Sequence, residues 1–184
     1  MDEPLWFGHH FSGKTTACHS SIRDLADQVA EHAAAIKRVF PHVRIGDTEP
    51  VGDGAIPIED WSSDIVEWLH QYRSAVGAPL AFMHLDVQWQ APSWQSRIRM
   101  ISGALRGADV PTGIVANGDG TSADGRTWTE SANRNLRGAI AAAGIPEYII
   151  FQSWDKHPRR FLPETDEGTM TGLVWKYVSG SSAR

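Results

Sequence analysis

Carboxyl and amide side chains follow several short apolar segments of this chain, at the points where those segments end. In chain order they are Asp47, Glu49, Asp86, Gln88, Asn117, Asp119 and Gln152. A pair of carboxyl groups can cleave a glycosidic bond, because one protonates the leaving oxygen while the other attacks the anomeric carbon or activates water. Glu49, Asp86 and Asp47 are therefore candidate catalytic residues, with Glu49 as the acid and Asp86 as the base or nucleophile.

The other side chains at these segment ends suit a sugar. Amides and carboxylates hydrogen-bond to hydroxyl groups, and an indole offers an apolar face for stacking together with a polar N–H. The candidate substrate-binding residues are His84, Gln88, Trp89, Asn117, Asp119, Gln152 and Trp154. The competing interpretation is that Asp and Asn at strand ends cap the turn or helix that follows, and the sequence leaves both open.

The elements that must position these side chains alternate between strand and helix. Strands are expected to start near residues 5, 43, 80, 112 and 147, about 35 residues apart, which suits βα units and a parallel sheet. Helices are expected over 22–40, 60–76, 94–105, 127–143 and 169–178. The first has apolar residues at steps of three and four, begins after Ser20-Ser21 and stops at Pro41.

Two architectures accommodate five such units. One is an open doubly wound sheet, and the other is part of an eight-unit barrel, which typically needs about 250 residues. In both, ligands bind at the carboxyl ends of the strands. The polar strand ends favour the barrel, so we expect one α/β domain over 1–184, a partial barrel of about five parallel βα units.

Several segments resemble the later part of uncharacterised bacterial TIM-barrel proteins that are similar to glycoside hydrolases. The segments are Ala17–Ser20, Ile45–Pro50, Met83–Trp89, Gln152–Trp154, Leu162–Asp166 and Thr169–Val174. The resemblance runs over about 7–177. It implies that Glu49-Pro50 corresponds to the acid/base Glu-Pro of many retaining glycosidases, although Thr48 replaces the usual Asn and Asn117 stands near where a nucleophilic Glu would lie. It also implies that Trp154 is a sugar platform.

The resemblance further implies that three N-terminal units are missing from the barrel. An open barrel exposes strand edges and an apolar interior, and such surfaces recruit partners. We therefore expect self-association, most simply a two-fold homodimer. Met1–Pro4 lacks the basic start and apolar stretch of a signal peptide. The proteins resembled look exported, so the localisation stays open.

A second function is suggested by Gly8–Thr15, which matches the G-x-x-x-x-G-K-[ST] pattern of a phosphate loop. In such a loop the backbone N–H groups bind phosphate, and here Lys14 and Thr15 would assist. The strand expected at 5–7 would precede it, although the best helix cap comes later, at Ser20-Ser21. A P-loop NTPase is thus the alternative enzyme, and a non-catalytic carbohydrate-binding barrel fragment is the alternative without turnover.

The composition and charge of the chain exclude several kinds of binding partner. Of 184 residues, 41% are hydrophobic and 21% charged, which excludes a disordered chain. The net charge of −5 and the absence of a Lys/Arg block argue against nucleic acid as a partner, and no apolar run is long enough to span a membrane.

A metal site is a further possibility in the sequence. His9, His10, His19 and His84 could join Asp47 or Asp86 around a metal ion. Scattered loop histidines are more often solvated, so no metal and no cofactor is expected.

Overall fold

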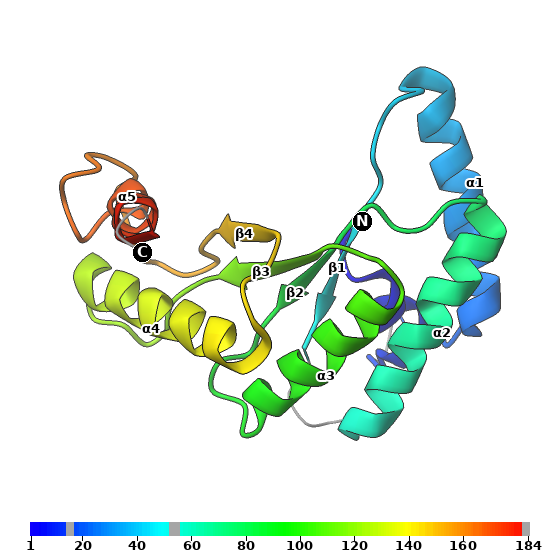
Figure 1. Ribbon diagram of the computed structural model, residues 1–184, viewed down its shortest axis with the longest axis horizontal. Coiled ribbons are helices and arrows are strands. Elements are labelled where there is room, and N and C mark those ends of the chain that lie inside the picture. Colours follow the sequence, from blue (N-terminus) through cyan, green and yellow to red (C-terminus); the bar gives the residue numbers. More distant parts are fainter. Residues whose placement is uncertain (14–16, 52–55, 182–184) are drawn as a thin grey trace.

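The protein has an α/β fold built on one parallel sheet. The computed structural model describes residues 1–13, 17–51 and 56–181. The four strands are β1 (Asp47–Pro50), β2 (Met83–Asp86), β3 (Thr112–Ala116) and β4 (Tyr148–Phe151), and they lie side by side in the order of the sequence (Figure 1). All three strand pairs are parallel. The predicted class and the last four predicted strands are therefore confirmed.

Helices separate the strands. They are α1 (Ile22–Val39), α2 (Ile58–Val76), α3 (Trp94–Gly107), α4 (Gly125–Ala143) and α5 (Met170–Ser181). The Ser21 side chain caps α1 as expected, and α2 ends at Gly77, whose φ of 75° is the left-handed conformation that favours glycine. Helix α4 begins two residues before the expected start at 127, and Asp124 and Thr127 form a capping box there.

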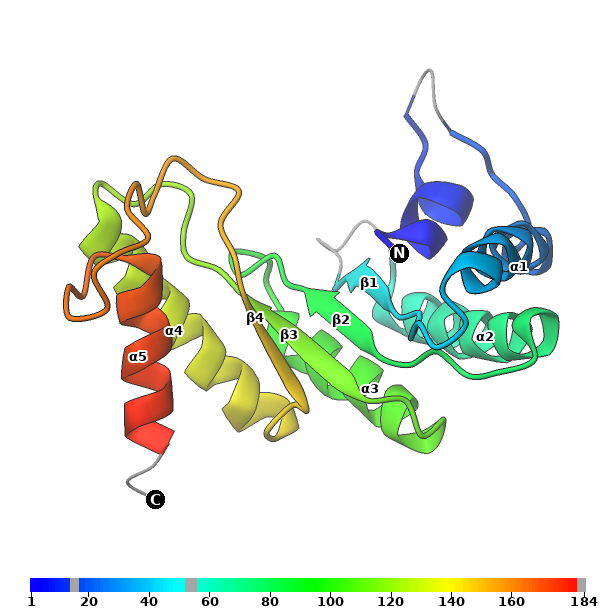
Figure 2. The same cartoon turned by 90° about the horizontal axis from the view of Figure 1, so that it is seen from above.

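The strand order bears on the doubly wound alternative. Such a sheet reverses its strand order and carries helices on both faces. Within the described residues the order is β1-β2-β3-β4 without reversal, and Figure 2 shows α2, α3 and α4 on one side of the sheet. The described part of the chain has no helix over the opposite face, which we call the open face. The doubly wound expectation therefore fails for this part of the chain.

The first predicted strand is wrong. Leu5–Phe7 is helical, and a π-helix, η1, spans Trp6–His10. Residues 1–3 lie along β1 instead: Glu3 N–H donates to the Thr48 carbonyl (2.8 Å), and Thr48 N–H donates to the Met1 carbonyl (3.1 Å). A three-residue apolar run cannot distinguish strand from helix by its spacing. The extended segment therefore precedes the predicted one by four positions.

The main core lies between the sheet and α1–α4. Trp61, Trp68 and Tyr72 of α2 are completely buried there, against Met83 and Leu85 of β2. Burial of such aromatic side chains stabilises the fold by about 2–3 kcal/mol each. The tryptophans of α2 are thus packing residues.

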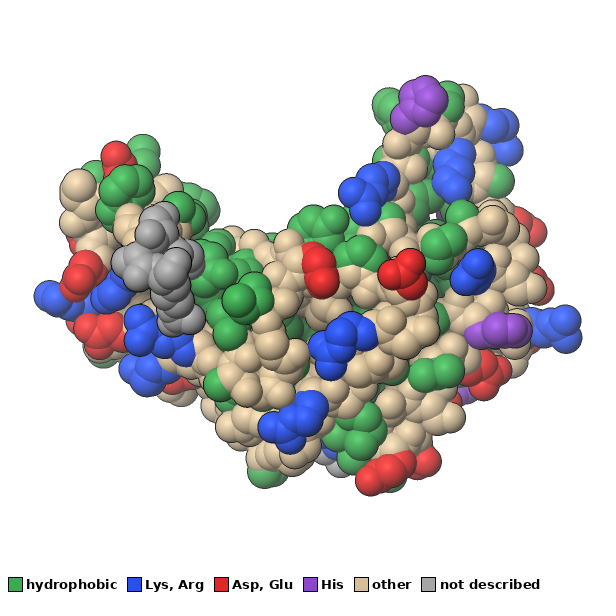
Figure 3. Space-filling model, in the orientation of Figure 1, with side chains coloured by type: hydrophobic (Ala, Val, Ile, Leu, Met, Phe, Trp, Pro, Cys, Tyr) green, Lys and Arg blue, Asp and Glu red, His purple; other side chains and the backbone are tan. Residues whose placement is uncertain are grey.

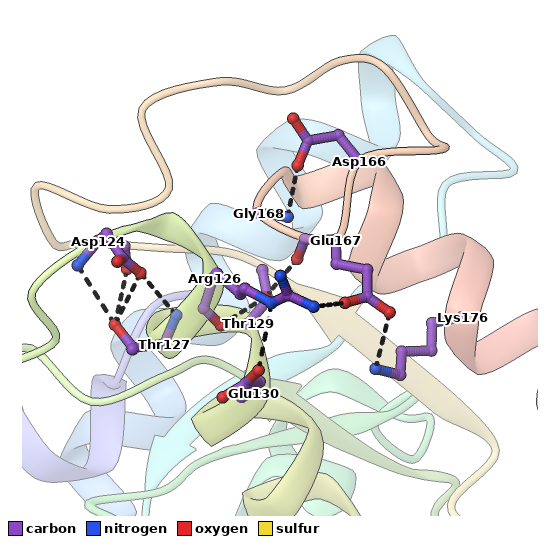
Figure 4. A network of polar contacts seen from close by, with 9 residues as sticks. All are labelled: Asp124, Arg126, Thr127, Thr129, Glu130, Asp166, Glu167, Gly168 and Lys176. Carbon is purple, nitrogen blue, oxygen red and sulfur yellow. Dashed lines mark hydrogen bonds and ion pairs between the residues drawn. The ribbon is translucent and has the colours of Figure 1, made fainter.

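A smaller core joins α4 to α5, and polar contacts border it. Trp128 and Ala132 of α4 pack on Met170 and Leu173 of α5. Arg126 lies between Glu130 and Glu167, at 3.5 and 2.6 Å, as Figure 4 shows. These ion pairs are exposed, so each contributes roughly 0–1 kcal/mol, and the apolar contacts hold α5 in place.

The open face of the sheet carries aromatic rings. The rings of Phe82 and His84 stack with centroids 4.4 Å apart, and Tyr148 meets both edge-on. A Cβ on Gly113 would come within 2.4 Å of the His84 ring, so the glycine leaves space for the ring to lie on the neighbouring strand. Figure 3 shows the molecule hollowed on this side, with hydrophobic side chains along the floor. No described helix is long and apolar enough to cross a membrane.

Candidate functional site

A cavity of about 410 Å³ lies at the carboxyl ends of the strands. Each strand of the sheet contributes to it, either with its last residue or with the loop that follows, and residues 3 and 6 close its side. The lining consists of Glu3, Trp6, Pro50, Asp86, Val87, Gln88, Trp89, Gln90, Asn117, Gly118, Gly120, Trp154 and Asp155. The cavity therefore occupies the position at which parallel α/β folds bind ligands. We call it the rim cavity.

The rim cavity brings together half of the site residues expected from the sequence. These are Asp86, Gln88, Trp89, Asn117 and Trp154. Its described lining does not include Asp47, Glu49, His84, Asp119 or Gln152. The two groups differ in which face of the sheet they occupy and in how far along the strand they lie.

Strand register explains why Asp47 and Glu49 lie elsewhere. Asp47 pairs with Met83 and Glu49 with Leu85, and both partners are buried beneath the helices. Residues paired across parallel strands point to the same face, so the two carboxyls of β1 point into the helix-covered core. The opposite face of β1 carries Thr48 and Pro50. The expectation that Glu49 and Asp47 reach the ligand is therefore not met.

Both buried carboxyls have structural partners. Glu49 accepts the backbone N–H groups of Leu5 (2.6 Å) and Trp6 (3.1 Å), at the start of η1. Asp47 accepts the indole N–H of Trp68 at 2.8 Å. Burial raises the pKa of Asp47 to about 7, and burial together with the nearby Asp47 raises the pKa of Glu49 well above its usual value. Glu49 fixes η1, and Asp47 fixes α2 against the sheet.

Three carboxyl groups line the rim cavity, those of Glu3, Asp86 and Asp155, and the surroundings of Glu3 and Asp86 raise their pKa values. Burial raises the pKa of Glu3 to about 7, and the charges of Asp86 and Asp2 add to this effect. The pKa of Asp86 is also raised, by burial and by Asp2. The charge of Asp86 thus favours the protonated form of Glu3, which makes up about half of the population near pH 7. A cavity with one protonated and one ionised carboxyl can perform acid and base chemistry.

Indoles and amides form the remaining walls. The Trp89 side chain is largely buried, packs edge-on against Trp94 (5.1 Å between ring centroids) and donates its indole N–H to the Asn117 side chain. Trp154 is 78% exposed at the cavity mouth. Trp128 donates its indole N–H to Asp155 at 3.2 Å, which positions this lining carboxylate. The wall formed by Trp89 and Asn117 is therefore fixed, and the exposed indole of Trp154 can stack on a ligand.

The other predicted binding residues have different surroundings. His84 lies further back on the open face, between the rings of Phe82 and Tyr148. The backbone N–H of Asp119 donates to Ser131 of α4 (2.8 Å), and its carboxylate accepts from the Gln90 side chain. Asp119 thus ties the loop after β3 to α4 and to the loop after β2, whereas the N-cap of α4 is Asp124. Gln152 follows β4 and is half-buried.

Sequence reasoning missed Glu3, Trp6 and Asp155. The signal for Glu3 was present, since Glu3-Pro4 is the same dipeptide as Glu49-Pro50. A strand at 5–7 would put Glu3 before the strand and not at its end, so the dipeptide does not point to a site under that expectation. Trp6 lies in η1 and Asp155 in the loop after β4, and nothing in the local sequence marks either residue as part of a cavity.

The phosphate-loop segment is described only in part. Lys14 and Thr15 lie outside the described residues. Gly8, His9 and His10 lie in η1 or at its end, and no strand precedes them. The strand-loop-helix order that a phosphate loop requires is therefore not present in the described part of the segment.

Comparison with known proteins gives no relative on which to base a function: no protein-family model, no curated protein and no solved structure matches the chain.

Proposed function

We propose that the rim cavity binds a carbohydrate and that the chain hydrolyses a glycosidic bond there. The observation that carries this proposal is the presence of two carboxyl groups, Glu3 and Asp86, in one cavity walled by indoles and amides. Glycoside hydrolysis requires two such carboxyls with different protonation states. The resemblance to uncharacterised barrel proteins similar to glycoside hydrolases implies Glu49 as the acid, and the proposal assigns that role to Glu3 instead, because Glu49 is completely buried.

Glu3 is the proton donor in this proposal. Its pKa of about 7 leaves the carboxyl largely protonated below neutral pH, where it can protonate the leaving oxygen. Asp86 is the ionised partner, which attacks the anomeric carbon or activates a water molecule. Gln88 and Asn117 are placed to hydrogen-bond to sugar hydroxyls, and the exposed face of Trp154 can stack on a pyranose ring.

A panel of chromogenic glycosides tests the proposal. Glu3→Gln and Asp86→Asn are each expected to lower kcat by about 10²–10⁴-fold, the range for loss of a general acid or base. Glu31→Gln, an exposed carboxyl on α1, is the matched control and should leave the rate unchanged. For the parent chain, the rate should fall as the pH rises above 7, because the donor form of Glu3 is lost.

The same experiment separates hydrolysis from binding alone. Tryptophan fluorescence reports sugar binding, because Trp6, Trp89 and Trp154 line the cavity. Saturable binding of oligosaccharides without turnover would replace the hydrolase with a non-catalytic carbohydrate-binding fragment. Neither binding nor turnover over a broad panel would remove carbohydrate altogether.

The second part of the proposal is that the sheet is a partial barrel completed by self-association. Parallel sheets are almost always covered on both faces, yet the described residues place no helix over the open face. Its rings include Tyr148, which is 36% exposed and belongs to β4, the last strand of the described sheet. A second copy of the chain would cover these rings and pair the free edge of β4.

Light scattering coupled to gel filtration tests this part. A dimer or larger homo-oligomer is expected at micromolar concentration. Ile150→Lys places a charge on the open face and should give a monomer, whereas Val66→Lys, on an exposed position of α2, should not. A monomeric parent chain would contradict self-association without affecting the hydrolase proposal.

A further inference from the structure

Two histidines and one carboxylate meet behind the wall of the rim cavity. His9 and His10 come from η1, and Asp64 comes from α2. One potential ligand atom of each residue lies within 4.8 Å of the other two, and His10 Nε2 lies 3.0 Å from Asp64 Oδ2. None of the three belongs to the cavity lining. The cluster is therefore separate from the proposed hydrolytic site.

The spacing is close to that of a metal-ligand set. A tetrahedral Zn²⁺ with bonds of about 2.0–2.2 Å holds its ligand atoms roughly 3.3–3.6 Å apart. The His10–Asp64 distance needs to open by only a few tenths of an ångström to reach this range. The His9 ligand atom lies within 4.8 Å of the other two.

The orientation of His9 suits a ligand. Its Nδ1 lies 2.7 Å from the Ser20 carbonyl oxygen, so Nδ1 carries the proton and donates it to that oxygen. Nε2 then keeps its lone pair. Metal-binding histidines are commonly oriented in this way, with the second ring nitrogen donating to a carbonyl or carboxylate. Gly8 accepts a hydrogen bond from Ser20 N–H at 2.9 Å, which holds the two segments together.

His10 is held equally firmly, but its inward nitrogen lacks a good partner. The ring lies against Trp61 (5.0 Å) and Trp6 (6.3 Å). Nε2 is buried, and no well-aligned hydrogen bond to it is found among the described residues, although Asp64 Oδ2 is near. A buried nitrogen beside a carboxylate oxygen, poorly placed for a shared proton, is well placed to bind a cation.

We propose that His9, His10 and Asp64 bind one divalent transition-metal ion of the Zn²⁺ type. Two imidazoles and one carboxylate give three protein ligands, and water takes the fourth position. The ion joins η1 to α2 and so fixes Trp6, which contacts His10 and lines the rim cavity. The metal site does not depend on the proposed hydrolysis, because none of its three ligands lines the rim cavity.

Metal titration of a tag-free chain, stripped with a chelator, tests the proposal. Calorimetry with Zn²⁺ should give one site per chain, and Co²⁺ should develop the visible absorption of a four-coordinate ion. Zn²⁺ should also raise Tm, because a ligand that binds only the folded chain stabilises it. Failure of the parent chain to bind one equivalent would overturn the proposal by itself.

Variants locate the site. Asp64→Asn and His10→Gln should each weaken Zn²⁺ binding about tenfold or more and abolish the Co²⁺ absorption. His32→Gln is the control, since His32 is exposed on α1. Circular dichroism of the metal-free variants checks that they fold. One-to-one binding that survives Asp64→Asn, or that is lost in His32→Gln, would assign the metal to other residues and refute this site.

Discussion

Replacement of Asp47 by Asn should make the protein more stable above neutral pH. The Asp47 carboxyl is completely buried, and one of its oxygens, Oδ1, has no hydrogen-bond partner among the described residues. The carboxylate is therefore poorly compensated when it ionises. Asn has nearly the same shape, and its side-chain oxygen can still accept the indole N–H of Trp68. The substitution removes the charge and keeps the hydrogen bond.

The magnitude follows from the pKa. Burial raises the pKa of Asp47 from 3.8 in the unfolded chain to about 7 in the folded one. The folded chain thus retains a proton that the unfolded chain releases, and the free energy of unfolding falls as the pH rises between these values. Each unit of pKa difference corresponds to about 1.4 kcal/mol, so the loss approaches about 4 kcal/mol. It is absent below pH 3.8 and complete above pH 7.

Urea denaturation between pH 4 and pH 8, followed by circular dichroism, measures the effect. The parent and Asp47→Asn should have similar stability at pH 4 and diverge by about 1.4 kcal/mol per pH unit toward pH 7. Glu49 remains in the variant, so part of the pH dependence persists. The matched control is Asp27→Asn, at an exposed position of α1, which should follow the parent. Parallel curves for the parent and Asp47→Asn would refute the reasoning.

Four further substitutions test the fold and the cavity. Gly113→Ala should lower the free energy of unfolding by about 1–3 kcal/mol in urea denaturation, because the new Cβ would lie 2.4 Å from the His84 ring. The control is Gly103→Ala on α3, where a Cβ meets nothing within 4 Å. It should raise the free energy of unfolding by about 0.5–1 kcal/mol. Glu49→Gln should lower the free energy of unfolding by about 1–3 kcal/mol, because one of the backbone N–H groups of Leu5 and Trp6 loses its acceptor. Limited proteolysis should then cut the variant near residues 5–10. Trp154→Ala should weaken oligosaccharide binding about three- to tenfold and change stability by less than about 0.5 kcal/mol; unchanged binding would remove Trp154 from the site.

Helix positions were predictable because the sequence carries their signals locally. The steps of three and four along 22–39 and the caps Ser21 and Gly77 define helix bounds within one or two residues. The strand ends were also predictable, since β2 shows its alternation directly: Met83 and Leu85 are buried, and the polar residues His84 and Asp86 alternate with them on the other face. Local signals of this kind need no knowledge of neighbouring strands.

Which side chains of β1 point toward the helices could not be predicted in the same way. Asp47 and Glu49 alternate with Thr48 and Pro50, so the strand shows polar residues on both faces. Only the register with β2 reveals which face meets the helices, and a shift of one residue would exchange the two faces. The usual assumption that carboxylates avoid the core gives the wrong answer here. The core tolerates them because Trp68 and the backbone of residues 5 and 6 supply donors.

The residue chosen from the sequence as the catalytic acid has instead a part in building the cavity. Glu49 holds the start of η1 through two backbone N–H groups, and η1 carries Trp6 into the cavity wall. The same short helix follows Glu3-Pro4, so its position also sets the direction in which Glu3 enters the cavity. Loss of Glu49 would therefore reduce activity by displacing Glu3 and Trp6, with unchanged chemistry at Asp86. Such a variant should lose affinity for sugar together with rate, whereas Glu3→Gln should lose rate while affinity is kept, and this difference distinguishes a residue that builds the site from one that acts in it.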